Sequence, residues 1–229
     1  MMCRLKFVLF IIPISLAGFM SSPAMAACSQ HPGVNMDWSK CFKERLVLKN
    51  TDMTKSTFEN AHLSGTSFSG AKLMDTNFVN AEVLRVSFKN ANLANANFKR
   101  AFGTHVNFEN ANLANASLYK SEFSRSTFSH ANLQGVNMSK GDFLRAVFDK
   151  ANMSGVNLSK SNISRASFKM TNLKGVDFNQ AFMFKTKIAG ADLSQVKGLK
   201  QEQVDMACGD KTTVLPSSLQ HASHWPCKE

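Results

Sequence analysis

An apolar residue recurs at every fifth position from Leu48 to Leu193, with Gly103 as the single exception. Two positions before each of these residues, from Thr51 to Ala191, the chain carries only Ala, Ser, Thr, Val or Gly. An α-helix cannot keep this phase, because its period of about 3.6 residues would carry the apolar stripe around its surface. A flat strand, with a side-chain period of about two, cannot keep it either. The repeat therefore predicts a coil of five-residue sides, each with one large and one small inward side chain.

A second period, of 20 residues, indicates that four such sides complete one turn. One column with this spacing is aromatic and consists of Phe68, Phe88, Phe108, Phe128, Phe148 and Phe168. Another is polar and consists of Asn92, Asn112, Asn132, Asn152, Asn172 and Asp192. Neighbouring turns are expected to hydrogen-bond as parallel strands do, about 4.8 Å apart. The sequence thus predicts an all-β fold, a four-sided parallel β-helix of about seven coils over residues 48–196.

Several repeats read Ala, then Asn or Asp, then Leu: ANLAN at 91–95 and 111–115, ANLQG at 131–135, and ADLSQ at 191–195. This pattern resembles the pentapeptide-repeat family, whose consensus is A-(D/N)-L-x-x, and the match covers roughly residues 46–198. The resemblance implies a right-handed quadrilateral parallel β-helix and implies no single activity. The flanking segments 33–41, 199–208 and 215–227 resemble those of exported proteobacterial members.

The first 26 residues have the pattern of a secretory signal peptide. Arg4 and Lys6 precede an apolar run from Phe7 to Met20, and a small-residue cleavage pattern ends at Ala26. The run is short for a membrane anchor, so we expect no transmembrane span after cleavage. The chain is therefore expected to be exported, to the periplasm or outside the cell. Anchoring as a lipoprotein through Cys28 ranks second, because the residues before it fit a lipobox poorly.

Four cysteines remain after the leader, in two pairs at the two ends of the chain. In an oxidising compartment this arrangement predicts the disulfides Cys28–Cys41 and Cys208–Cys227, of which the first would be lost if Cys28 were lipidated. A solenoid must cover its terminal turns, so we expect a small N-terminal cap at 27–47 and a C-terminal cap at 197–229. The expected N-terminal cap packs Trp38, Phe42 and Leu46 behind its disulfide, and the expected C-terminal cap contains a short helix over about 200–207. Trp225 and the second disulfide are expected to hold the tail.

Positive charge is concentrated on one half of the predicted rod. The formal net charge is +11, and loss of the leader with its two basic residues leaves 27 − 2 − 16 = +9. Two columns lie two positions past the apolar centres. The first ladder consists of Arg85, His105, Arg125, Arg145, Arg165 and Lys185, and the second ladder of Arg100, Lys120, Lys140 and Lys160. Glu82, Glu122 and Asp142 are expected to pair in part with the arginines three residues later.

A basic surface of this kind has two interpretations. It is either a solvated face that keeps the rod soluble, or a linear surface that binds an anionic partner. Apolar residues beside the first ladder, Leu84, Leu144, Phe182 and Phe184, favour an interaction surface.

One repeat breaks the pattern. Phe102-Gly103 places glycine at an apolar centre and phenylalanine beside it. Either Phe102 turns inward or the coil bulges, and a local adjustment is expected because the phase resumes at Phe108.

The sequence carries no nucleophile elbow, P-loop, dinucleotide fingerprint or zinc-protease motif, so we expect no enzyme activity and no cofactor. A metal site of His221 and His224 with Cys208 and Cys227 is rejected in favour of a disulfide, so no metal is expected.

We predict a scaffold that binds a protein or an anionic envelope component, with nucleic acid an unlikely partner. Mimicry of DNA to regulate topoisomerases is the disfavoured alternative, because it needs an acidic face and a cytosolic location. A secreted factor acting on a host remains open.

Overall fold

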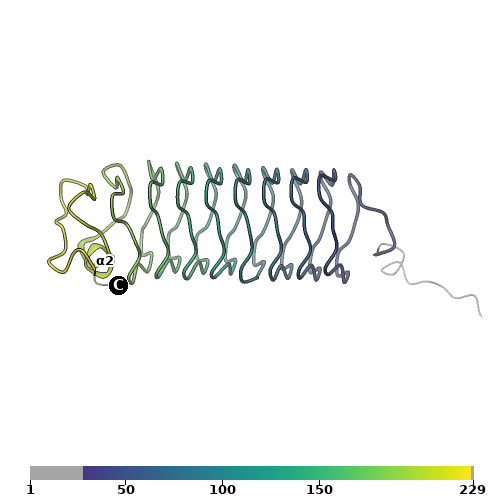
Figure 1. The fold of residues 1–229 in the computed structure, drawn as a ribbon, viewed down its shortest axis with the longest axis horizontal. Coiled ribbons are helices and arrows are strands. Elements are labelled where there is room, and N and C mark those ends of the chain that lie inside the picture. Colours follow the sequence, from purple (N-terminus) through teal and green to yellow (C-terminus); the bar gives the residue numbers. More distant parts are fainter. Residues whose placement is uncertain (1–27, 228–229) are drawn as a thin grey trace, which may run out of the picture.

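The computed structural model describes residues 28–227, and they form a rod of stacked turns (Figure 1). The predicted leader, residues 1–26, lies outside the described residues. Successive turns are joined by parallel pairings between residues 20 apart, from Asp37 with Thr57 to Asp177 with Lys197. The predicted 20-residue turn of four five-residue sides is therefore confirmed. Within 28–227 no helix is long and apolar enough to cross a membrane.

Each five-residue side follows one backbone pattern, illustrated by residues 91–95. Ala91 and Leu93 point inward and are buried, while Asn92 between them points outward and pairs with Asn112 of the next turn. Two turn residues follow, and the second, Asn95, has a φ of 60°. A side this short pairs through a single residue, so the turns are joined by isolated bridges rather than by long strands.

Stacked phenylalanine rings fill the interior. Along the predicted column, the ring centroids of successive turns lie between 4.7 and 5.3 Å apart, as for Phe68 with Phe88 and Phe108 with Phe128. A second column, Phe58, Phe78 and Phe98, meets the first edge to face. Such stacked and edge-on pairs contribute about 0.5–1.5 kcal/mol beyond area burial.

The Phe102-Gly103 repeat is accommodated without a bulge and without an inward turn of Phe102. Phe102 remains outward, 42% exposed, and keeps its pairings with Glu82 and Glu122. A Cβ at Gly103 would lie 2.7 Å from the Val83 carbonyl carbon, which explains the glycine. Only the following turn is loosened, with a His105 N to Ser124 O distance of 3.3 Å.

The N-terminal segment continues the coil geometry, since pairing begins at Asp37. The Cys28–Cys41 disulfide closes it, and Trp38 is buried with its ring edge against Phe58. The expected packing of Phe42 behind this disulfide is wrong. Phe42 occupies an outward position, is 76% exposed and stacks on His62 of the next turn.

The C-terminal segment places the single helix of the described residues, α2 (Gln201–Met206), at the end of the rod (Figure 1). The buried Gln203 side chain donates to the carbonyl oxygens of Phe178 and Ala181, both at 2.8 Å. The Trp225 indole donates to Ala207 O, and the Cys208–Cys227 disulfide holds the following tail. These contacts satisfy carbonyl groups that the last turns would otherwise leave without partners.

Candidate anion-binding surface

All ten residues of the two ladders occupy the second turn position of their five-residue sides, the corner of the coil. Each is exposed, and each has a φ between 52° and 59°. This left-handed conformation suits glycine and asparagine, and it costs other L-residues roughly 1–2 kcal/mol. Another corner column obeys that preference and reads Asn95, Asn115, Gly135, Gly155 and Gly175. The ladders therefore place Arg, Lys and His where the backbone favours other residues.

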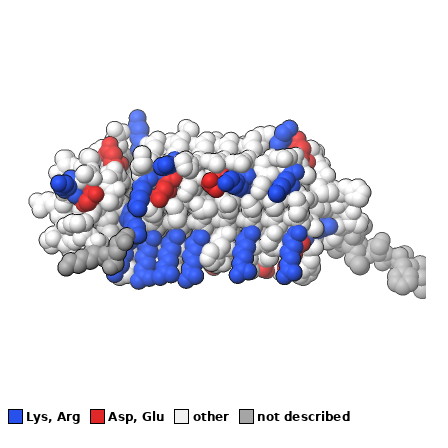
Figure 2. All heavy atoms as spheres, viewed as in Figure 1, with Lys and Arg blue, Asp and Glu red and all other residues white. Residues whose placement is uncertain are grey.

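The two ladders are the two edges of one side of the rod. Lys120 stands immediately before the side formed by Ser121 to Phe123, and Arg125 closes the turn that follows it. We call this side, with its two ladders, the basic side. Figure 2 shows a row of Lys and Arg along one edge of the rod. The prediction placed both ladders on one half of the rod without identifying the side that they share.

Among residues 28–227, the ladder cations form no ion pair. The ion pairs among residues 28–227 are His62–Glu82, Lys72–Asp52 and Lys89–Glu109, and none includes a ladder member. Glu82 therefore pairs with His62 of the previous turn, not with Arg85 as expected.

The other two predicted pairings also fail, since within the described part of the chain neither Glu122 nor Asp142 forms an ion pair. Asp142 instead accepts hydrogen bonds from the Leu144 amide and the Asn162 side chain. The positive charge of the ladders is thus left uncompensated by direct contacts.

An open groove of about 740 Å³ runs beside the second ladder. Its lining consists of Arg100, Phe102, Lys120, Glu122, Lys140, Gly141, Asp142, Lys160 and Asn162. The ammonium groups of Lys120 and Lys140 lie 5.5 and 5.6 Å from the ring centre of Tyr119. A hydrogen bond with Lys140 and the charges of both lysines lower the pKa of the Tyr119 phenol.

A second hollow, of about 610 Å³, lies where the first ladder meets the C-terminal segment. Arg145, Arg165 and Lys185 border it together with Lys169 and Lys187. The Cys208–Cys227 disulfide forms part of its wall. The positive surface is therefore densest near this end of the rod.

The apolar residues beside the ladders divide into two groups. Phe182 and Phe184 are 51% and 42% exposed, and Lys185 lies 5.8 Å from the Phe184 ring centre. Leu84 and Leu144 are only half-buried, so they add little to an exposed apolar surface. Phe102, which the sequence treated only as a defect, is an exposed ring between the ladders.

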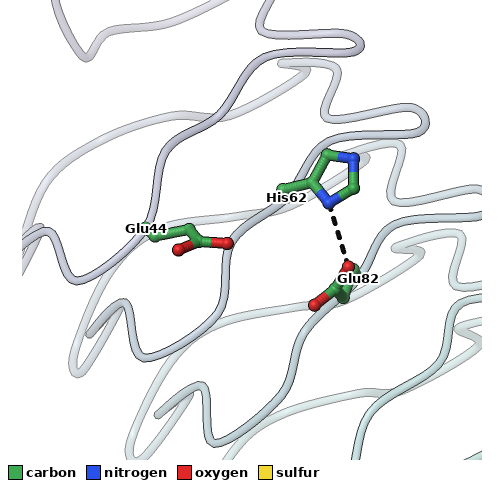
Figure 3. A group of neighbouring side chains, drawn as sticks. All are labelled: Glu44, His62 and Glu82. Atoms are coloured by element: carbon green, nitrogen blue, oxygen red, sulfur yellow. Dashed lines mark hydrogen bonds and ion pairs between the residues drawn. The ribbon is translucent and has the colours of Figure 1, made fainter.

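Three of the six histidines, at two places, lie close to other residues of metal-binding type. At the C-terminal end, His221 and His224 bond the carbonyl oxygens of Thr213 and Ala207, while both cysteines there are joined in the disulfide. On the basic side, His62 lies beside Glu82 and Glu44 (Figure 3). The sequence predicted no metal site here and paired Glu82 with Arg85, although intervals of 18 and 20 residues place Glu44, His62 and Glu82 in neighbouring turns of the predicted coil.

The stacked turns, parallel pairings and inward columns define a repeat β-helix solenoid. The model of the pentapeptide repeat region matches residues 51–122 and 101–178, and that of pentapeptide repeats in eight copies matches 161–197. The chain belongs to the pentapeptide repeat family. No curated protein matches it.

Among solved structures, the chain is similar to HetL, a pentapeptide repeat protein involved in heterocyst differentiation regulation in the cyanobacterium Nostoc. The two are 18% identical over 84% of this chain and 94% of HetL, with a TM-score of 0.64. Full-length QnrB1, a plasmid-mediated fluoroquinolone resistance protein, is 17% identical over 80% of this chain and 94% of its own, with a TM-score of 0.41. The first likeness supports the fold, and neither supports a function.

Proposed function

We propose that this protein is a non-enzymatic, exported β-helix scaffold that binds an anionic envelope component through its basic side. The winding we propose is right-handed and quadrilateral, with about seven coils between two disulfide-closed caps. A linear anionic polysaccharide suits this surface best, because the ladders present single cations in register along the rod, about 4.8 Å apart.

One observation carries the proposal: ten exposed residues, nine of them permanent cations, stand at left-handed corners without an ion pair among residues 28–227. Residues held in a backbone conformation that favours other residue types are typical of functional sites. Repulsion between cations in neighbouring turns also opposes folding unless an anion is bound. A surface that served only solubility would require neither the backbone strain nor the repulsion between cations.

Two further features support the location and the choice of partner. Two disulfides are typical of proteins that fold in an oxidising, exported compartment. Mimicry of DNA would need a continuous acidic column, and within 28–227 no column has more than two successive acidic residues, such as Glu122 and Asp142.

The test is binding of the mature protein to an anionic polysaccharide and, separately, to anionic lipid vesicles, at increasing salt. We expect polysaccharide binding that weakens with salt and is lost in Arg125→Glu/Arg145→Glu. The matched control, Lys150→Glu/Lys174→Glu, makes the same charge change away from the basic side, at and beside the other two corner columns. Salt-independent binding, or equal loss in both variants, would refute the proposal, and binding to vesicles alone would replace the polysaccharide with a membrane surface.

A further inference from the structure

A third side chain, Glu44, lies near the hydrogen-bonded pair of His62 and Glu82 (Figure 3). One potential ligand atom of each residue lies within 4.8 Å of those of the other two. The three residues come from three successive turns. Glu82 lies one turn after His62, and Glu44 lies one turn before Ser64, which is in the same turn as His62. The hydrogen-bonded turns fix these backbones, so the three groups are brought together before any ligand arrives.

Neighbouring side chains fix the orientation of two of the three groups. The His62 ring stacks on Phe42 with a centroid distance of 4.4 Å and an angle of 4°. His62 Nδ1 lies 2.9 Å from Glu82 Oε2, and Ser64 donates to the other carboxylate oxygen, also at 2.9 Å. Supporting contacts of this kind hold metal ligands in a productive arrangement.

The charge of this cluster differs from that of the chain around it. The protein carries a net charge of +11, yet within 28–227 neither Glu44 nor Glu82 forms an ion pair with a Lys or Arg. Two neighbouring carboxylates repel each other, and a bound cation removes that repulsion. The imidazole beside them adds a nitrogen ligand, which an ordinary pair of surface acids lacks.

We propose that Glu44, His62 and Glu82 form a zinc-binding site near the N-terminal end of the basic side. One imidazole nitrogen and two carboxylate oxygens suit Zn²⁺, whereas Ca²⁺ and Mg²⁺ take oxygen ligands. Zinc–ligand distances of about 2.0–2.2 Å require the exposed Glu44 side chain to swing toward the other two. Zn²⁺ takes the place of the hydrogen bond between His62 Nδ1 and Glu82 Oε2: the neutral imidazole binds it through Nδ1 in the tautomer that carries the proton on Nε2, and a water completes the tetrahedron.

The experiment is calorimetric titration of the metal-free mature protein with Zn²⁺ alone, and with Ca²⁺ and Mg²⁺ as comparisons. We expect one zinc ion per chain, and affinity reduced about tenfold or more in His62→Gln and in Glu82→Gln. Glu122→Gln is the matched control, because Glu122 occupies the same outward column without a histidine partner within 28–227. Its zinc affinity should match that of the wild type.

The proposal is overturned if His62→Gln binds zinc as the wild type does, if Glu122→Gln loses as much, or if Ca²⁺ binds as tightly as Zn²⁺. It is also overturned if only His221→Gln/His224→Gln removes zinc binding. All the substituted residues point outward or lie at the C-terminal tail, and circular dichroism checks that each variant folds. Zinc binding by Arg125→Glu/Arg145→Glu, the variant expected to lose polysaccharide binding, should be unchanged, which separates this site from the function proposed for the ladders.

Discussion

Two corner columns of this rod have the same backbone conformation and different side-chain chemistry. At the column that runs from Asn95 to Gly175, every residue suits the left-handed conformation, and no side chain there carries charge. At the first ladder the same conformation holds Arg125, Arg145 and Arg165, which suit it poorly. Since both kinds of corner enclose the same apolar interior, folding alone does not explain the difference. We take this difference as support for the binding role proposed for the ladders.

Among the variants considered, a substitution in the shared interior should reduce stability most. Phe108→Ala removes a ring that stacks on Phe88 and Phe128, with centroid distances of 5.1 and 4.7 Å. We expect a loss of about 3–5 kcal/mol in the free energy of unfolding, measured by chemical denaturation. A loss no larger than that caused by substituting an outward-pointing residue would show that the interior does not stabilise both corner columns.

The asparagine column should give the next largest effect. Asn132 donates to Asn112 Oδ1 at 3.1 Å and accepts from Asn152 at 3.2 Å and from the Gln134 amide at 3.3 Å. We expect Asn132→Ala to cost about 1–3 kcal/mol, because partly buried amide partners lose their bonds. Arg125→Ala, measured in the same way, should cost less, and equal costs would contradict the distinction between a structural column and a binding ladder.

Replacing a corner glycine with a cationic residue measures the free-energy cost of the left-handed conformation by itself. Gly155 has a φ of 70°, and a Cβ there would meet no atom within 4 Å, so backbone strain is the main cost. We expect Gly155→Arg to lower the free energy of unfolding by about 1 kcal/mol and to leave polysaccharide binding unchanged. An increase in stability would show that these corners do not disfavour arginine.

The smallest effect should come from Asp192, which ends the asparagine column. Hydrogen bonds from Ser194, through its side chain and then its backbone amide, lower the pKa of Asp192. A lowered carboxyl pKa adds stability above the unfolded pKa, and that stability is lost as the pH falls through the folded value. Thermal unfolding of the wild type should therefore weaken slightly more between pH 6 and 3 than that of Asp192→Asn, as measured by circular dichroism. Identical pH profiles of the wild type and Asp192→Asn would show that Asp192 makes no such contribution to stability.

The sequence predicted most of what depends on the phase of the repeat. The Phe68 column, the short helix before Ala207 and the two cysteine pairings follow from spacing and compartment. The contacts between turns were harder to predict. Glu82 was assigned to Arg85, three residues away, but its partner is His62, because stacking brings residues 20 apart closer than the corner allows neighbours to approach.

The adjacency of the two ladders could have been read from the sequence. Their members differ by five residues, which is one side of the coil, as for Lys120 and Arg125. The exposure of Phe42 follows from the same count, because Phe42 lies 20 residues before His62 in an outward column of the coil.

The most direct test of the account measures stability and binding in one variant, Arg125→Asn/Arg145→Asn/Arg165→Asn, which gives the first ladder the residues of the other corner type. The account predicts a free energy of unfolding equal to or above that of the wild type, because strain and repulsion are relieved, together with loss of salt-dependent polysaccharide binding. Unchanged binding by a variant that folds normally would contradict it.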